Sequence, residues 1–180
     1  LWGAPDKFKG MWTLHGKGSF PTEGVADTAL YWDIEMQTEA DLKMRYTASP
    51  CPEEWTKRYK DQCDHGTAFE GEEGWIYVRR GVLNAHPKSL LENLKSPDES
   101  NANADSTYAH VSDFLQSVRS RKPARSEIDV SVLGDAICHV SDIAIRLDRE
   151  VRFDSQKETF PGDEEANRRL TRAMRPPWHL

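Results

Sequence analysis

Hydrophobic and polar residues alternate along much of the first half of the chain. From Leu30 to Gln37 every second side chain on one side is apolar, and residues 42–47 repeat the alternation after a short polar connection at 38–41. A period of two is typical of strands with one face in a core, so we predict an antiparallel hairpin here. The same reasoning predicts further strands at residues 12–18, 67–70, 75–80 and 82–85.

The second half of the chain changes to the period of a helix. One stripe spaced i, i+3, i+4 and i+7 consists of Val111, Phe114, Leu115 and Val118. A longer apolar seam beginning near residue 129 consists of Val130, Leu133, Ile137, Val140, Ala144 and Leu147. Both spacings are typical of amphipathic helices. A solvated loop is expected at 96–107, a short strand at 151–153 and a helix at 163–170.

Strands in the first half followed by helices in the second predict an α+β fold. We expect an open, mostly antiparallel sheet with helices packed on one face. Residues 75–78 are apolar on both sides of their strand, so we expect both faces to be covered, by helices or by another subunit. Residues 50–65 form an irregular excursion with one helical turn. We expect residues 1–180 to form a single domain, in which residues 1–15 are a linker-like start.

Length and charge exclude several classes of protein. The chain has 180 residues, a net charge of −6 and an apolar fraction of 37%. This length can bury a core without disulfides. The acidic balance argues against a nucleic-acid partner, because phosphate neutralisation needs a basic face. Apolar runs reach four residues against the roughly 20 that span a bilayer, so no membrane association is expected.

Three cysteines, Cys51, Cys63 and Cys138, cannot all pair within one chain, which favours a reducing compartment. We therefore expect a cytoplasmic protein; export is the alternative, because a signal would precede Leu1. Cys51, Cys63 and His65 are candidate metal ligands, but zinc sites use two closely spaced pairs of ligands and no second pair follows. No metal is expected.

No cofactor motif is present in the sequence. Gly16 and Gly18 are followed by Pro21, which cannot continue the helix that would hold a dinucleotide pyrophosphate. The phosphate-binding, serine-hydrolase and zinc-protease motifs are absent as well. We expect this chain to bind no cofactor and to contain no catalytic residue. Glu70, Glu72 and Glu73 read as solvated turn residues rather than an acid/base pair.

His139 is the most distinctive titratable residue. It lies on the flank of the long apolar seam, with Asp135 four residues before it and Asp142 three residues after it. Either carboxylate could orient the imidazole and raise its pKa, which suits a substrate-orienting role. The alternative is a histidine at the boundary of the core.

Arg175 and Trp178 flank a rigid pair of prolines near the C-terminus. A guanidinium and an indole in this arrangement can form a stacking and carboxylate-binding corner. Alternatively, Trp178 inserts into the core.

Several segments together resemble a known family. These are residues 65–78 (HGTAFEGEEGWIYV), 87–91 (PKSLL), 138–147 (CHVSDIAIRL), 151–154 (VRFD), 160–167 (FPGDEEAN) and 174–178 (MRPPW). In this order, over residues 16–180, they resemble the C-terminal domain of bacterial oxidoreductases of the Gfo/Idh/MocA family.

The resemblance implies a two-domain enzyme that is larger than this chain. Its N-terminal Rossmann domain would bind NAD or NADP, and its C-terminal α+β sheet would form contacts in a homo-oligomer. The family's substrates are sugars, cyclitols and related polyols. Its catalytic histidine and aspartate would lie just before Leu1, so we expect the fragment itself to be inactive.

These observations leave three hypotheses for the function. The first is a substrate-binding and oligomerisation domain of a nicotinamide-dependent dehydrogenase, with His139, Arg175 and Trp178 framing the substrate pocket. The second is a self-sufficient carbohydrate-binding or protein-interaction module that uses Trp12, Trp55 and Trp178 as stacking platforms. The third is a metal-dependent hydrolase built on Cys63 and His65.

Overall fold

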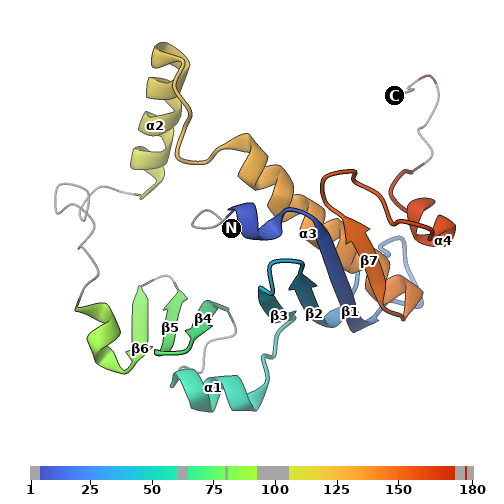
Figure 1. Cartoon of the computed structure of the whole chain (residues 1–180), viewed down its shortest axis with the longest axis horizontal. Coiled ribbons are helices and arrows are strands. Elements are labelled where there is room, and N and C mark those ends of the chain that lie inside the picture. Colours follow the sequence, from blue (N-terminus) through green and yellow to red (C-terminus); the bar gives the residue numbers. More distant parts are fainter. Residues whose placement is uncertain (1–4, 61–64, 80, 93–105, 173–176, 178–180) are drawn as a thin grey trace. The chain divides into compact units, whose positions relative to one another are not determined.

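The computed structural model describes residues 5–60, 65–79, 81–92, 106–172 and 177 (Figure 1). The chain divides into two compact units. Unit 1 comprises Leu1–Ala48 and Glu127–Leu180, and unit 2 comprises Ser49–Ser126. Unit 2 is therefore inserted between two segments of unit 1.

Unit 1 contains a four-stranded antiparallel sheet, here called sheet A. Its strand order is β3-β2-β1-β7, so the last strand of the chain lies beside the first. The residue pairs Trp12–Thr38 and Leu14–Met36 fix the register of the two central strands. The elements of unit 1 are η1 (Pro5–Phe8), β1 (Met11–Ser19), β2 (Tyr31–Thr38), β3 (Lys43–Thr47), α3 (Ile128–Leu147), β7 (Val151–Asp154) and α4 (Glu164–Asn167).

One face of sheet A is covered by α3, as the apolar seam of this helix predicts. Trp12 and Leu14 of β1 and Ala144 of α3 are completely buried between the two layers. Gly18 permits this close approach, because a Cβ atom there would lie 2.8 Å from Cδ1 of Ile145. The core of unit 1 is therefore formed by segments more than 100 residues apart in the sequence.

A buried polar link joins β3 to α3. The hydroxyl group of Ser141 donates a hydrogen bond to the Ile137 carbonyl, at 2.6 Å, and accepts one from Tyr46. Burial raises the pKa of Tyr46. The neutral phenol therefore acts as the donor that attaches the edge strand to the helix.

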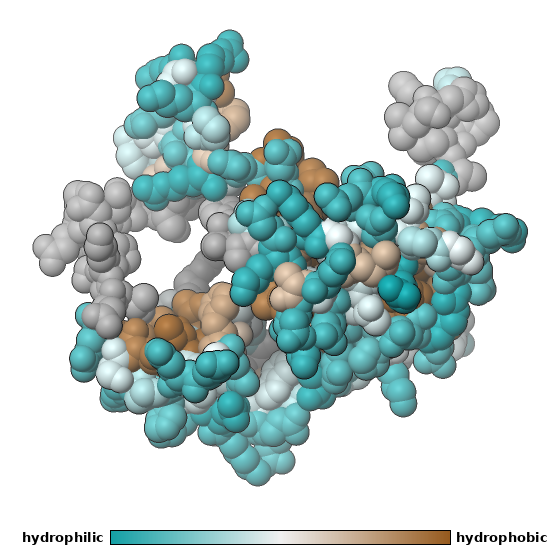
Figure 2. Space-filling model, viewed as in Figure 1, coloured by the Kyte–Doolittle hydropathy of each residue, from teal (hydrophilic) through white to brown (hydrophobic). Residues whose placement is uncertain are grey.

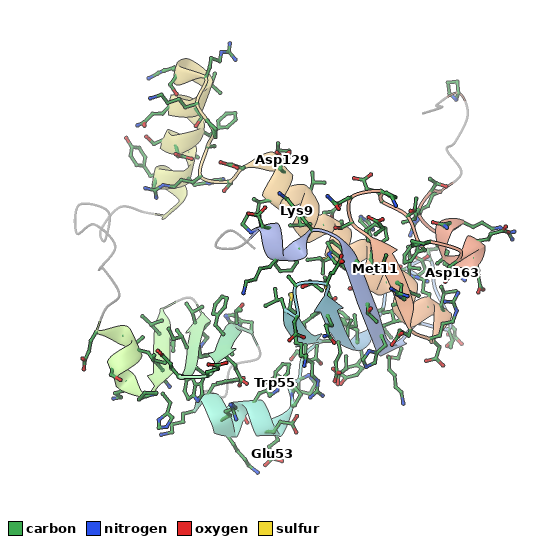
Figure 3. All side chains as sticks on the ribbon, viewed as in Figure 1. Lys9, Met11, Glu53, Trp55, Asp129 and Asp163 are labelled. Atoms are coloured by element: carbon green, nitrogen blue, oxygen red, sulfur yellow. The ribbon has the colours of Figure 1, made fainter. Side chains whose placement is uncertain are left out.

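Unit 2 contains a three-stranded antiparallel sheet, sheet B, in the order β4-β5-β6. Tyr59, Trp75 and Tyr77 form its small core, against which Trp55 packs. Trp55 belongs to the helix α1 (Glu53–Tyr59) and is labelled in Figure 3. The rings of Tyr59 and Tyr77 are stacked at a centroid distance of 5.5 Å. The elements of unit 2 are α1 (Glu53–Tyr59), β4 (Thr67–Gly71), β5 (Gly74–Arg79), β6 (Val82–His86), η2 (Lys88–Leu91) and α2 (Ser106–Ser120).

The structure confirms the predicted fold class: open antiparallel sheets with helices, in an α+β arrangement. Three details differ from the prediction. Leu30 is 67% exposed because it precedes β2, where its backbone N–H closes the hairpin onto Ser19. The predicted helix 163–170 is shortened to α4. Within the described residues the second face of β5 is not fully covered, since Val78 is 38% exposed.

Candidate functional site

His139 lies on the exposed side of α3. Its side chain is 75% exposed, and its Nε2 lies 3.3 Å from a carboxylate oxygen of Asp135. The other predicted partner, Asp142, is instead bonded to Nε of Arg146 at 2.7 Å. One of the two carboxylates thus orients the ring, and the histidine belongs to the surface rather than to the boundary of the core.

The two remaining candidate residues, Arg175 and Trp178, lie outside the described residues. Cys63 also lies outside the described residues, whereas Cys138 is an exposed free thiol. Among the residues that the structure describes, no group of three or more His, Cys, Asp or Glu side chains could hold a metal ion.

Of the three tryptophans proposed as stacking surfaces for carbohydrate, one is buried in the core. Trp12 has no exposed surface, and its indole N–H donates a 2.6 Å hydrogen bond to the carbonyl of Phe8 inside the core. Trp55 is half-buried against the aromatic core of unit 2. The prediction that Trp12 presents a surface for carbohydrate was wrong, because its strand turns this position toward α3.

A polar hollow of about 320 Å³ opens in unit 1 beside strands β1 and β2. Its lining consists of His15, Gly16, Lys17, Asp33, Glu35, Asp148, Arg149 and Glu150. His15 lies 3.4 Å from Glu35 directly across the strand pair. Alternation predicts polar residues on this outer face, but not that the turn from α3 into β7 forms one wall of a hollow.

The charges of this outer face are largely paired. The Arg45 guanidinium makes two hydrogen bonds, of 3.0 and 2.8 Å, to the two carboxylate oxygens of Asp33. These bonds hold the pKa of Asp33 below its usual value. Asp33 therefore stays ionised at neutral pH. The hollow offers ion-pairing and hydrogen-bonding groups rather than an activated nucleophile.

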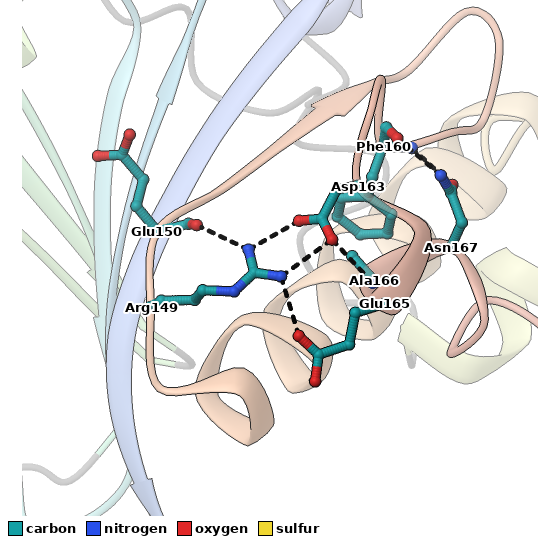
Figure 4. A network of polar contacts seen from close by, with 7 residues as sticks. All are labelled: Arg149, Glu150, Phe160, Asp163, Glu165, Ala166 and Asn167. Atoms are coloured by element: carbon teal, nitrogen blue, oxygen red, sulfur yellow. Dashed lines mark hydrogen bonds and ion pairs between the residues drawn. The ribbon is translucent and has the colours of Figure 1, made fainter.

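Arg149 lies at the centre of a second polar network, which fixes the turn before α4 (Figure 4). Its guanidinium bonds both oxygens of Asp163, at 2.7 and 2.9 Å, and contacts Glu165 at 3.4 Å. Asp163 also caps α4 by accepting a hydrogen bond from the backbone N–H of Ala166. The bonds to Arg149 lower the pKa of Asp163.

Asn167 closes the same turn from its other end (Figure 4). Its side-chain oxygen accepts from the N–H of Phe160 at 2.9 Å, and its amide nitrogen donates to the Phe160 carbonyl at 2.7 Å. Phe160 itself is completely buried. The segment 160–167, which carried part of the family resemblance, thus has a structural role in the fold.

One of the three glutamates near the turn of sheet B, Glu70, contacts residues of α1. Glu70 accepts a 2.7 Å hydrogen bond from the hydroxyl group of Tyr59 and pairs with Arg58 at 2.6 Å. Burial, reinforced by this bond to Glu70, raises the pKa of Tyr59 to about 12. Glu70 is therefore tied to α1, and it supports the aromatic core rather than acting as one of an acid/base pair.

The fold and the polar surfaces together define the class of the protein. It is an α+β domain with an open antiparallel sheet, a long helix on one face of that sheet and an inserted small module. No helix among the described residues is long and apolar enough to cross a membrane.

The family model for the C-terminal α/β domain of the Gfo/Idh/MocA oxidoreductases matches residues 31–180. The chain therefore belongs to this oxidoreductase family, as its C-terminal α/β domain. No curated protein and no solved structure matches the chain.

Proposed function

We propose that the chain is the substrate-binding and oligomerisation domain of an NAD(P)-dependent oxidoreductase. The proposed substrate is a sugar, a cyclitol or a related polyol. The family match over residues 31–180 is the observation that supports this proposal. The chain on its own is expected to be inactive. We also propose a cytoplasmic location; the free thiol of Cys138 agrees with it, because thiols stay reduced there.

The described residues do not fit a nicotinamide cofactor. A dinucleotide site needs glycines between a strand and the N-terminus of a helix. Gly16 and Gly18 instead lie inside β1, where Cβ atoms would meet the Asp33 carbonyl at 2.5 Å and Ile145 at 2.8 Å. These two glycines allow β1 to pack closely against β2 and α3. The proposal therefore assigns NAD or NADP to a Rossmann domain that this chain does not contain.

For the substrate we propose contacts from His139, Arg175 and Trp178. The exposed imidazole of His139, oriented by Asp135, can donate to or accept from a hydroxyl group. A guanidinium and an indole add bidentate hydrogen bonding and a stacking surface for a sugar ring. Their shared task is to orient the carbon that exchanges hydride.

The test uses the enzyme that carries both domains and a panel of polyols and sugars. Alanine substitution of His139, Arg175 or Trp178 should lower kcat/KM for the best substrate by about tenfold or more. Ser131→Ala, at an exposed position on α3, is the matched control and should have no effect. If all three variants stay within about threefold of the parent, a loss below roughly 1 kcal/mol, these contacts are refuted.

For the homo-oligomer we propose the outer face of sheet A as the interface. On this face β1 presents His15 and Lys17, and β2 presents the acidic residues Asp33 and Glu35, which also contact Arg45 and His15 within the chain. A twofold axis that places β1 of one copy over β2 of the other brings unlike charges together. The charge pattern is thus complementary to itself.

Light scattering tests the interface. The chain should form a dimer or higher oligomer that weakens as salt rises from about 0.1 to 1 M, because the Debye length falls from about 10 to 3 Å. Lys17→Glu should weaken the assembly, and Lys7→Glu in η1 should not. A monomer at every concentration would contradict the oligomer, whereas an oligomer insensitive to Lys17→Glu would place it on another surface.

A further inference from the structure

Sheet B has an open apolar face. The cross-strand register puts Val78 beside Leu83, and Phe69 beside Ile76, on the side of the sheet away from the aromatic core. Phe69 is 60% exposed and Leu83 is 52% exposed. Figure 2 shows hydrophobic residues gathered over this sheet. Apolar side chains on both faces of a sheet are typical of a layer that is covered twice.

The helix α2 has an apolar stripe that is equally uncovered. The stripe consists of Tyr108, Val111, Phe114, Leu115 and Val118, with exposures from 46% to 72%. A helix of 15 residues is only marginally stable in water without tertiary packing. The helical state of α2 therefore calls for a surface that covers the stripe.

The dimensions of the open face select its occupant. Three strands about 4.8 Å apart and five residues long, at about 3.3 Å per residue, give a face of roughly 230 Å². A stable interface between two protein copies buries about 800 Å² of accessible surface on each partner, so a face of this size would supply only part of one. A 15-residue helix is about 22 Å long and about 10 Å wide, so one helix is long enough to cover a face about 16 Å long.

The segment that connects the two surfaces is long enough for α2 to reach sheet B. Residues 93–105 join η2, which directly follows sheet B, to α2. Thirteen residues span at most about 45 Å, which is more than twice the length of the face. A tether of this length holds a helix near the sheet at an effective concentration of about millimolar.

We propose that α2 packs its apolar stripe across the open face of sheet B. Unit 2 is then a three-layer module, in which α1 covers one face of the sheet and α2 covers the other. Phe114 and Leu115 lie at the centre of the stripe, and Ile76 and Val78 lie on the central strand of the face. This contact does not depend on the proposed enzyme activity or on the oligomer of sheet A.

Hydrogen exchange in the 180-residue chain tests the contact. The amides of α2 should be protected, and Val78→Asp on the sheet should speed their exchange by about tenfold. Val132→Asp, at a similarly exposed apolar position on α3, is the matched control and should leave α2 unchanged. Unprotected α2 amides in the parent chain, or no response to Val78→Asp, would overturn the proposal.

Photo-crosslinking identifies the covering surface directly. A benzophenone amino acid at position 114 should crosslink to peptides of β4–β6 within the monomer band, whereas the same label at Gln116, on the polar side of α2, should not. Crosslinks found mainly in a dimer band would assign the face to a second copy. Crosslinks to unit 1 would assign α2 to another surface. Either result would overturn the proposal.

Discussion

Units 1 and 2 differ in how completely the apolar faces of their sheets are covered. In unit 1 the apolar face of sheet A is matched by α3, and the opposite face is polar, with Arg45 and Asp33 paired on it. In unit 2 the aromatic core covers one face of sheet B, while Phe69 and Leu83 on the other remain exposed. A polar face is stable in water without a covering layer, whereas an exposed apolar face indicates that a further layer covers it.

The largest effect is expected in the core of unit 1. Trp12→Ala removes a side chain with no exposed surface, together with its hydrogen bond to Phe8. A cavity of this kind costs about 3–5 kcal/mol of unfolding free energy. Urea denaturation measures the loss. A cost below about 1 kcal/mol would show that unit 1 is not as tightly packed as the comparison requires.

A second substitution tests whether the two units unfold independently of each other. Trp75→Ala removes one of the three aromatic residues in the core of unit 2 and should cost about 3 kcal/mol there. Because unit 2 has its own core, hydrogen exchange should accelerate in β4–β6 while α3 keeps its protection. Equal acceleration in both units would show that they unfold as one.

Alkaline pH should weaken unit 2 through Tyr59. The folded unit keeps the phenolic proton to a pKa of about 12, whereas an unfolded tyrosine loses it near 10. The stability that this proton contributes is complete below pH 10 and is lost as the pH rises toward 12. Exchange or near-ultraviolet dichroism of unit 2 should show this loss.

Tyr59→Phe is the control for this pH dependence. It removes the titrating group but keeps the ring that stacks on Tyr77. The variant should lose the part of the alkaline dependence that unit 2 owes to Tyr59. An unchanged profile would assign the dependence to other groups.

The smallest effect is expected on the outer face of sheet A. Asp33→Asn removes a partly exposed ion pair with Arg45 and should cost no more than about 1 kcal/mol. The cost should vanish at acid pH, since the lowered pKa of Asp33 contributes stability that is lost as the carboxylate is protonated. Thermal unfolding at pH 7 and pH 2 compares the two conditions.

Periodicity predicted the elements that depend on near neighbours in the sequence. The hairpin of β2 and β3, the turn between β4 and β5 and the seam of α3 all follow from residues within one strand or helix. The family resemblance also came from short segments that the family match bears out.

Contacts between distant segments could not be predicted in this way. The hydrogen bond between Tyr46 and Ser141 joins residues 95 positions apart, and it depends on how α3 lies on sheet A. The alternation on β1 did not reveal that Trp12 faces a helix rather than solvent. Nor did composition reveal the bonds from Arg149 and Asn167 that fix the turn before α4.

We have proposed that this domain binds substrate while another domain holds the nicotinamide. Titration of the 180-residue chain with NAD⁺ and NADP⁺, followed by tryptophan fluorescence and calorimetry, tests it most directly. We predict no saturable binding up to about 1 mM, which corresponds to a binding free energy weaker than about −4 kcal/mol. Saturable binding of either nucleotide at micromolar concentration would contradict it.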